Sequence, residues 1–255
     1  MTPFVHHNSI VRKIWGKSDT ILFIFAGAAA EFALNKAVDW LYFTGRLPND
    51  PIGRLFSTVG YARQIVFASK EDAERTIDRI NSIHSAVENA RQAKIPDWAY
   101  RDVLYMLIHY SIAAFELLER KLSDQEKEEV YAVFWRMGVR MNIPQLPPSF
   151  TDWLPERERH MQEDLAKSRH TDDLFFQYKK ALGWFRYRVL IEGQVLVVPQ
   201  KVAKLLGFKN FSLLSPVVPV YKMSRLVKLD GAIKWLLLPA EYKQQIRELD
   251  IAPSS

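Results

Sequence analysis

Apolar residues recur every three or four positions along most of the chain, with charged and polar residues between them. This spacing places apolar side chains on one face of an α-helix, so the pattern predicts one helix after another. After Ser69, for example, Ala73, Ile77, Ile80 and Val87 fall on one stripe. We predict helices over residues 18–42, 52–68, 69–92, 97–120, 123–141, 151–169 and 171–190, another from Pro199, and two short ones over 223–237 and 239–249.

Local signals mark where several of these helices begin. Ser69 and Ser123 are each followed three residues later by an acidic residue, which is the spacing of a capping box. Residues 45–51 combine Gly, Pro, Asn and Asp, and they predict a turn. The helix over 97–120 is apolar on most faces, so we expect it at the centre of the fold.

Three stretches are less regular. Residues 142–155 hold four prolines and predict a loop. Residues 189–198 are rich in β-branched side chains, which favours a strand, although the surrounding pattern favours a helix. Residues 211–222 contain Pro216 and Pro219 and are interpreted as an apolar connector.

No internal repeat, low-complexity tract or long linker divides the chain. The economical prediction is an all-α fold, formed by a single globular domain over residues 1–255 with a loose N-terminal segment over 1–17. We expect roughly eight to eleven helices packed in the manner of globins.

Residues 12–30 imitate a targeting segment, because Arg12, Lys13 and Lys17 precede an apolar run that ends in alanines. Asp19 lies beside that run, and the run is shorter than the roughly 20 residues that cross a bilayer. We therefore expect a buried core helix here, with a targeting or membrane-inserted segment as the alternative.

Composition removes several classes of protein. The chain has no cysteine, which excludes disulfide scaffolds, thiolate zinc sites, iron–sulfur clusters, cysteine nucleophiles and covalently attached haem. This composition fits a reducing compartment, and a cytoplasmic location is expected. With only 10 glycines among 255 residues, a glycine-rich phosphate loop is not favoured.

The net charge of +6 is unevenly distributed. Between Lys179 and Arg247 there are 13 Lys and Arg against three acidic residues, a net +10, which leaves −4 for the rest of the chain. A solvated basic face is one interpretation, and a surface for anionic lipid or a pocket for anionic groups is another. Nucleic acid is not expected as a partner, because no recognised module accompanies these charges.

The six histidines differ in their surroundings. His84 extends the apolar stripe of its helix, and His109 lies in an almost wholly apolar run, so both are expected to point inward. A buried histidine is either a satisfied core residue or a ligand. The others are expected at a frayed end or on solvated, charged helices; they are His6, His7, His160 and His170.

No familiar catalytic or metal-binding motif accompanies these histidines. The Glu-x-x-His pairs of a di-iron bundle are missing before His84 and His109. A single histidine on an apolar helix is nevertheless enough to hold a haem, and without cysteine that haem has to be bound non-covalently.

Four short segments occur in an order that resembles a known family. They are DPIGRLFST at 50–58, IHSAV at 83–87, IHYS at 108–111, and the C-terminal LPA at 238–240 with REL at 247–249. Together they resemble the catalytic domain shared by latex clearing protein (rubber oxygenase) and MpaB-type oxygenases, including small bacterial members. Each segment is weak evidence alone, and the ordered set is more specific.

The resemblance implies an all-α fold that binds haem b and its iron and uses dioxygen on hydrophobic, isoprenoid-like substrates. The proximal haem ligand of the family corresponds to His84, and the distal Arg and Thr correspond to Arg54 and Thr58. His109 is a second candidate for binding the cofactor. In this interpretation Arg54 would pair with a propionate or stabilise oxygen, and Thr58 lies one helical turn away on the same face.

Three positions depart from the family pattern: Ser57 stands where latex clearing proteins have Lys, Glu88 where the proximal motif has Arg, and Asn35 where small members have His. The alternative is therefore a non-enzymatic helical protein that binds haem or an apolar ligand. Such a protein could contact anionic membranes peripherally through its basic C-terminal third. Substrate identity, oligomeric state and electron donor have no signal in the sequence.

Overall fold

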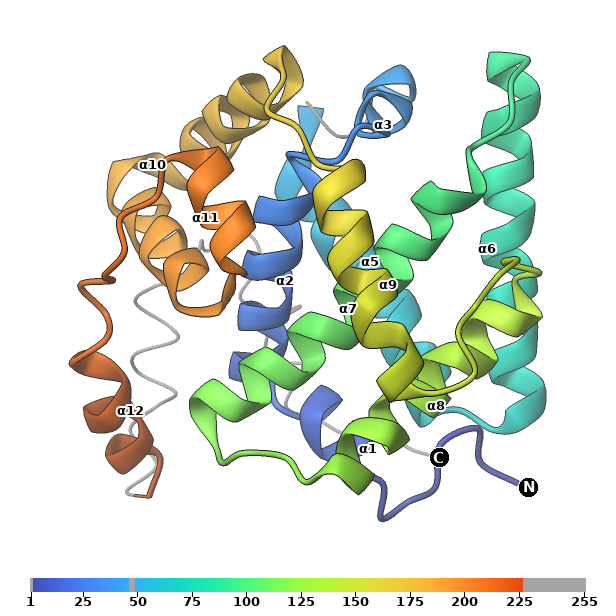
Figure 1. Cartoon of the computed structure of the whole chain (residues 1–255), viewed down its shortest axis with the longest axis horizontal. Helices are drawn as coiled ribbons and strands as arrows, with labels where there is room; N and C mark the ends of the chain where they lie inside the picture. The colour runs from blue at the N-terminus through green and yellow to red at the C-terminus, as the bar shows by residue number, and fades with distance from the viewer. Residues whose placement is uncertain (1, 46–48, 227–255) are drawn as a thin grey trace.

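The structure, a computed structural model, describes residues 2–45 and 49–226. Over these residues it is all-α, as the sequence predicts, and it contains helices and no strand (Figure 1). The described helices are α1 (Ile10–Trp15), α2 (Ser18–Phe32), α3 (Asp39–Phe43), α5 (Pro51–Phe67), α6 (Lys70–Arg91), α7 (Asp97–Leu118), α8 (Asp124–Arg140), α9 (Phe150–Glu163), α10 (Arg169–Val197), α11 (Gln200–Leu206) and α12 (Val217–Leu226).

Helix α7 lies at the centre, as its apolar character predicts (Figure 1). Its most extensive packing is against α2, while α8 and α9 contact it elsewhere and α10 covers another side of α2. Tyr105, Ile108 and Tyr110 of α7 have no exposed surface. The core therefore forms around an α2–α7 pair, and the expectation that residues 12–30 contribute a buried helix is confirmed by α2.

The predicted capping signals are present. The Ser69 hydroxyl accepts a hydrogen bond from the Asp72 N–H at 3.2 Å, at the start of α6. At the start of α8, Ser123 and Glu126 form a complete capping box. The expected helices over 52–68, 97–120 and 123–141 accordingly agree with α5, α7 and α8 to within about two residues.

Other boundaries differ from the prediction. Residues 10–15, expected in a loose segment, form α1, because Ser9 caps the helix and Ile10, Val11, Ile14 and Trp15 are buried. The helix expected over 18–42 ends at Phe32. A turn follows, in which the Asn35 side-chain oxygen accepts from the Ala37 N–H at 2.8 Å.

The second half of the chain is more helical than expected. Residues 189–198, which fit either element, belong to α10, and the expected connector over 211–222 contains the start of α12. Pro219 is compatible with that helix because it lies in its first turn. Residues 227–255, with the C-terminal motif and nearly all of the two expected final helices, lie outside the described residues.

Candidate functional site

Arg54 and Thr58 lie one turn apart on α5. The helix begins after Asp50, whose carboxylate accepts from the Gly53 N–H at 2.8 Å, and Pro51 occupies its first turn. The Arg54 guanidinium donates to the Ser57 hydroxyl at 3.2 Å, and the Thr58 hydroxyl donates to the Arg54 carbonyl at 3.2 Å. The expected register of Arg54 and Thr58 on one face is therefore present.

His84 of α6 is half-buried, and its Nδ1 atom is enclosed and has no hydrogen-bond partner among the described residues. Its ring meets Tyr100 of α7 edge-on, with 5.2 Å between the ring centroids. Burial lowers the pKa of His84, and the positive charge of Arg54 lowers it further, while Glu88 acts in the opposite direction. The fold thus brings Arg54 close enough to act electrostatically on His84, and burial and Arg54 both favour the neutral imidazole.

The C-terminal half of α6 is poorly covered. Helix α6 packs on α5 and α8 but makes no comparable contact with α7, the next helix in the chain. Beyond Ile77, Glu88 is the single fully buried residue of this helix, and Ile83 remains 39% exposed. The apolar side chains around His84 therefore border a surface that the described part of the protein does not fill.

His109 has different charged neighbours from His84. Burial lowers the pKa of His109 to about 4, with a further lowering by Arg157 and an opposing effect of Glu31. Its ring lies edge-on to Tyr110, with 4.9 Å between the centroids. The charged groups that act on His109 are thus Arg157 and Glu31, whereas those that act on His84 are Arg54 and Glu88.

Glu31 and Arg157 form an ion pair inside the protein. The Arg157 Nη2 atom lies 2.5 Å from Glu31 Oε2, and the Tyr110 hydroxyl donates to the same oxygen at 2.8 Å. Burial would raise the pKa of Glu31, but the charge and hydrogen bond of Arg157, together with smaller effects of His109 and Tyr110, lower it. Glu31 Oε1 and two nitrogens of Arg157 are buried and find no partner within the described ranges of the chain.

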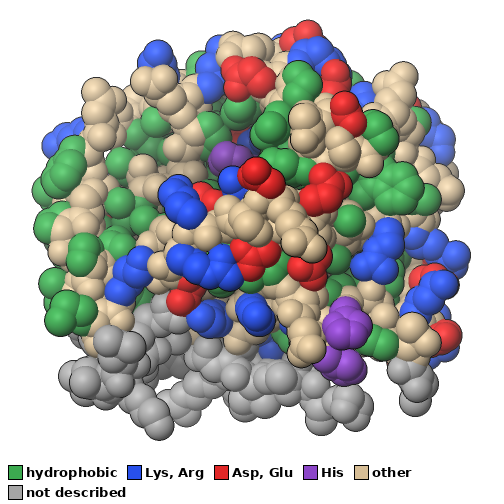
Figure 2. Space-filling view, turned by 60° about the horizontal axis from the view of Figure 1, so that its bottom comes forward, with side chains coloured by type: hydrophobic (Ala, Val, Ile, Leu, Met, Phe, Trp, Pro, Cys, Tyr) green, Lys and Arg blue, Asp and Glu red, His purple; other side chains and the backbone are tan. Residues whose placement is uncertain are grey.

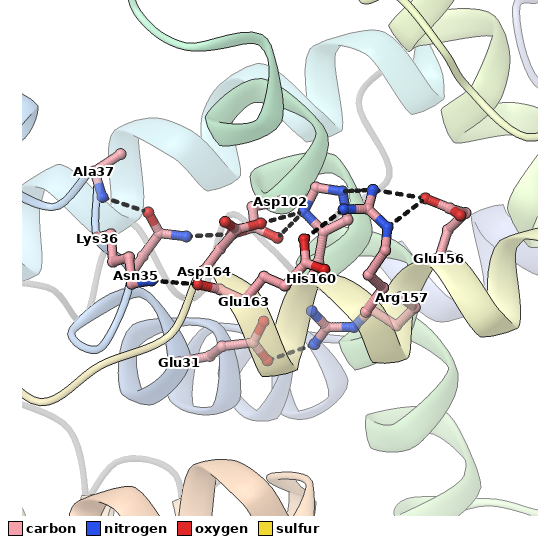
Figure 3. A network of polar contacts seen from close by, with 11 residues as sticks. Glu31, Asn35, Lys36, Ala37, Asp102, Glu156, Arg157, His160, Glu163 and Asp164 are labelled. Atoms are coloured by element: carbon pink, nitrogen blue, oxygen red, sulfur yellow. Dashed lines mark hydrogen bonds and ion pairs between the residues drawn. The ribbon is translucent and has the colours of Figure 1, made fainter.

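A second buried group lies beside this pair (Figure 3). The Nδ1 atom of His160 is 3.0 Å from Asp102 Oδ1 and 2.8 Å from Asp164 Oδ2. Asp102 also accepts a short hydrogen bond from the Asn35 amide. His160 and Asp102 are almost completely buried, which makes this cluster part of the protein interior.

The placement of His160 corrects the sequence interpretation. It was expected on a solvated face of a charged helix, yet it has no exposed surface. Most charged residues of α9 lie on its outer side, while Trp153, Arg157, His160 and Met161 form its buried side, where Glu31 pairs with Arg157. The spacing of His160 and Asp164, one helical turn apart, was the signal that could have found the pair.

A comparison with family models shows to which family the chain belongs. Residues 13–228 match the model described as ER-bound oxygenase mpaB/B'/Rubber oxygenase, catalytic domain. The chain belongs to this family. Neither the comparison with curated proteins nor the comparison with solved structures gave a significant match.

The three departures from the mpaB/rubber oxygenase pattern have structural partners. Glu88 accepts hydrogen bonds from Lys94 Nζ at 2.8 Å and from the Ile95 N–H at 2.9 Å. These bonds stabilise the turn between α6 and α7. Asn35 bridges Asp102 and the backbone after α2. Ser57 is exposed and bonds Arg54, which leaves no ammonium group at that position.

The fold also bears on membrane insertion. Among the helices of the described residues, none combines the length and the apolar character that a bilayer crossing requires.

Proposed function

We propose that this member of the mpaB/rubber oxygenase family is a haem b-dependent oxygenase that acts on a hydrophobic, isoprenoid-like substrate. His84 would hold the iron, and Arg54 and Thr58 would lie on the distal side. Support comes from one observation above all. The histidine of the family motif is a half-buried imidazole whose pKa is lowered by burial, and it lies on an incompletely covered half of its helix.

The residues present fit a haem. Bound haem would supply dioxygen binding and redox chemistry, which no side chain of this cysteine-free protein provides. A neutral imidazole is the protonation state that an iron ligand needs. The enclosed Nδ1 atom of His84 has no partner in the part of the chain that the structure describes. If the other ring nitrogen held the iron, Nδ1–H would need an acceptor that orients the ring.

Arg54 and Thr58 would act on polar oxygen atoms next to the cofactor. The Arg54 guanidinium lies on this face and donates to Ser57, and a guanidinium binds a propionate carboxylate or a developing negative charge strongly. The Thr58 hydroxyl donates to the Arg54 carbonyl and can turn toward an oxygen atom on the same face. Ile83 and Val87 would keep this surface apolar and exclude water.

The visible spectrum of the purified protein tests the haem assignment. We expect a Soret band, either as purified or after addition of haemin, and we expect His84→Gly to lose or shift it. Added imidazole should restore the band of His84→Gly by replacing the missing ring. His109→Gln is the matched control, because it also changes an inward histidine but should leave the ligand in place.

Two results would contradict the assignment. A colourless protein that takes up no haemin would remove the cofactor, and an unchanged Soret band in His84→Gly would remove the ligand. Oxygen uptake with squalene as an apolar isoprenoid probe then tests the catalytic part. A haem-loaded protein without such uptake would favour the non-enzymatic alternative.

A second proposed property is peripheral contact with anionic membranes, as part of the same function or of the non-enzymatic alternative. Hydrophobic side chains reach the surface on the side where α10 and α12 lie (Figure 2). Trp184 is 69% exposed and follows the exposed Lys179 and Lys180 on α10, a combination typical of interfacial anchoring. Flotation with vesicles containing phosphatidylserine should fall for Trp184→Ala and not for Leu154→Ala, an exposed apolar residue on α9.

A further inference from the structure

The buried cluster of Asp102, His160 and Asp164 has a role in none of the chemistry proposed above. It joins the central helix α7 to α9 and to the residue that follows α9. One nitrogen and two carboxylate oxygens, one from each side chain, lie within 4.8 Å of one another. Figure 3 shows the three side chains converging in the interior, next to Asn35.

Their spacing suits a small cation. His160 Nδ1 is 3.0 Å from Asp102 Oδ1 and 2.8 Å from Asp164 Oδ2. Neighbouring ligand atoms in an octahedral shell with bonds of about 2.1 Å are about 3 Å apart. The distances from the imidazole nitrogen to the two oxygens therefore match those between neighbouring ligand atoms of one ion.

The bonding pattern points in the same direction. Although His160 Nδ1 and Asp102 Oδ1 are close, the direction of the ring nitrogen does not match a hydrogen bond to either carboxylate. Within residues 2–45 and 49–226, neither atom has a hydrogen-bond partner. Asp102 and His160 are 1% and 0% exposed. Two buried, facing polar atoms without a bond are costly unless a third group satisfies them.

The remaining oxygen of Asp102 is already bound. The Asn35 amide donates to Asp102 Oδ2, and the Ala37 N–H in turn fixes Asn35. Such an outer contact turns Oδ1 toward His160 and is the usual way in which a ligating carboxylate is oriented.

We propose that Asp102, His160 and Asp164 bind one divalent transition-metal ion of the Mn²⁺, Co²⁺ or Zn²⁺ class. Two carboxylates and one imidazole give a borderline ligand set that favours such ions over soft ones. The ion neutralises the two carboxylates and ties α9 to α7. The assignment is independent of a haem at His84.

The competing arrangement holds a proton instead of a metal. Arg159 Nη2 lies 3.4 Å from His160 Nε2, and a contact in which Nε2 accepts would place the ring proton on Nδ1, between the carboxylates. Metal binding through Nδ1 requires the proton on Nε2, and Arg159, which is 43% exposed on its side chain, would have to turn away. The two arrangements exclude one another.

Cobalt binding distinguishes them. Tag-free, full-length protein is dialysed against chelator and titrated with Co²⁺, with binding followed by calorimetry and by the visible absorption of the ion. We expect one equivalent to bind, and we expect Asp164→Asn and Asp102→Asn each to weaken binding by at least about tenfold. Glu163→Gln, an exposed neighbour of Asp164, should bind like the wild type.

Separate outcomes overturn the proposal. Absence of stoichiometric binding of Co²⁺, Mn²⁺ and Zn²⁺ would do so, as would wild-type affinity in both Asp variants. Binding that disappears in a His6→Ala, His7→Ala double variant but persists in Asp164→Asn would assign the metal to the exposed histidine pair. Circular dichroism of each variant shows whether it is folded, and so distinguishes loss of folding from loss of a metal ligand. The Soret band of Asp164→Asn shows separately whether that variant still binds haem.

Discussion

Gly27 of α2 lies against the ring of Tyr110 on α7 so closely that a Cβ atom at Gly27 would be 2.3 Å from two ring carbons. The absence of a side chain therefore sets the distance between the two helices at the centre of the fold. Tyr110 is fully buried, so its ring has no room to retreat. Its hydroxyl binds Glu31, one turn beyond Gly27 on the same helix.

Replacing Gly27 by alanine should destabilise the protein. Overpacking a filled core by one methyl group costs about 1–3 kcal/mol, which more than offsets the gain in helix propensity. The free energy of unfolding in urea measures this. Gly60→Ala is the control, because a Cβ there meets nothing within 4 Å and α5 should become slightly more stable. Equal stability of Gly27→Ala and the wild type would show that α2 and α7 can move apart.

The buried ion pair of Glu31 and Arg157 predicts a strongly non-additive pair of substitutions. Arg157→Met leaves the Glu31 carboxylate buried and unpaired, and we expect a loss of about 3–5 kcal/mol. Adding Glu31→Leu removes that charge, so the double variant should regain part of the loss. Urea unfolding of the two single variants and the double variant gives the coupling energy. Strictly additive losses would contradict a direct pair.

Much of the helical fold could be predicted from the sequence because its signals are local. Ser69 and Ser123 mark helix starts through hydrogen bonds within one turn, and the apolar surface of α7 is visible from its composition. The end of α2 was not predictable in this way. It depends on Asn35, whose side chain binds Asp102, a residue far away in the sequence.

In the candidate site, too, relationships within one helix could be predicted from the sequence and contacts between helices could not. Arg54 and Thr58 share a helix, so their common face follows from spacing alone. The burial of His160 does not, because the charged residues around it suggest solvent and only packing of α9 on α7 turns that side inward. Partners contributed by different helices, such as Asp102, become visible only in the folded chain.

Gly183 interrupts α10, and we predict that replacing it strains the backbone without disturbing side-chain packing. Its φ of 72° and ψ of 169° lie in a region that residues with a side chain rarely adopt, and a Cβ there would meet nothing within 4 Å. Gly183→Ala should therefore cost about 1–3 kcal/mol through strain alone, or straighten the helix. Urea unfolding measures the loss, with Gly60→Ala as the unstrained control. An unchanged or increased stability would show that alanine tolerates the kink.

The environment of His109 predicts a dependence of stability on acid. Burial, and after it the charge of Arg157, lower the pKa of His109 to about 4 in the folded protein, against about 6.5 for an unfolded chain. Between these values the unfolded chain binds a proton that the folded protein does not, so the free energy of unfolding should fall as pH decreases from about 6.5 to about 4. The titration of His109 should lower the free energy of unfolding by up to about 3 kcal/mol over that interval and should not change it above about pH 6.5.

The variant His109→Gln tests this expectation, because glutamine cannot take up the proton. The unfolding free energies of this variant and of the wild type are measured in urea across that pH range. Their difference isolates the contribution of His109 from the contributions of the other titratable groups. A difference that stays constant from pH 7 to pH 4 would mean that His109 is protonated inside the folded protein and that Glu31, which faces it together with Arg157, holds the charge.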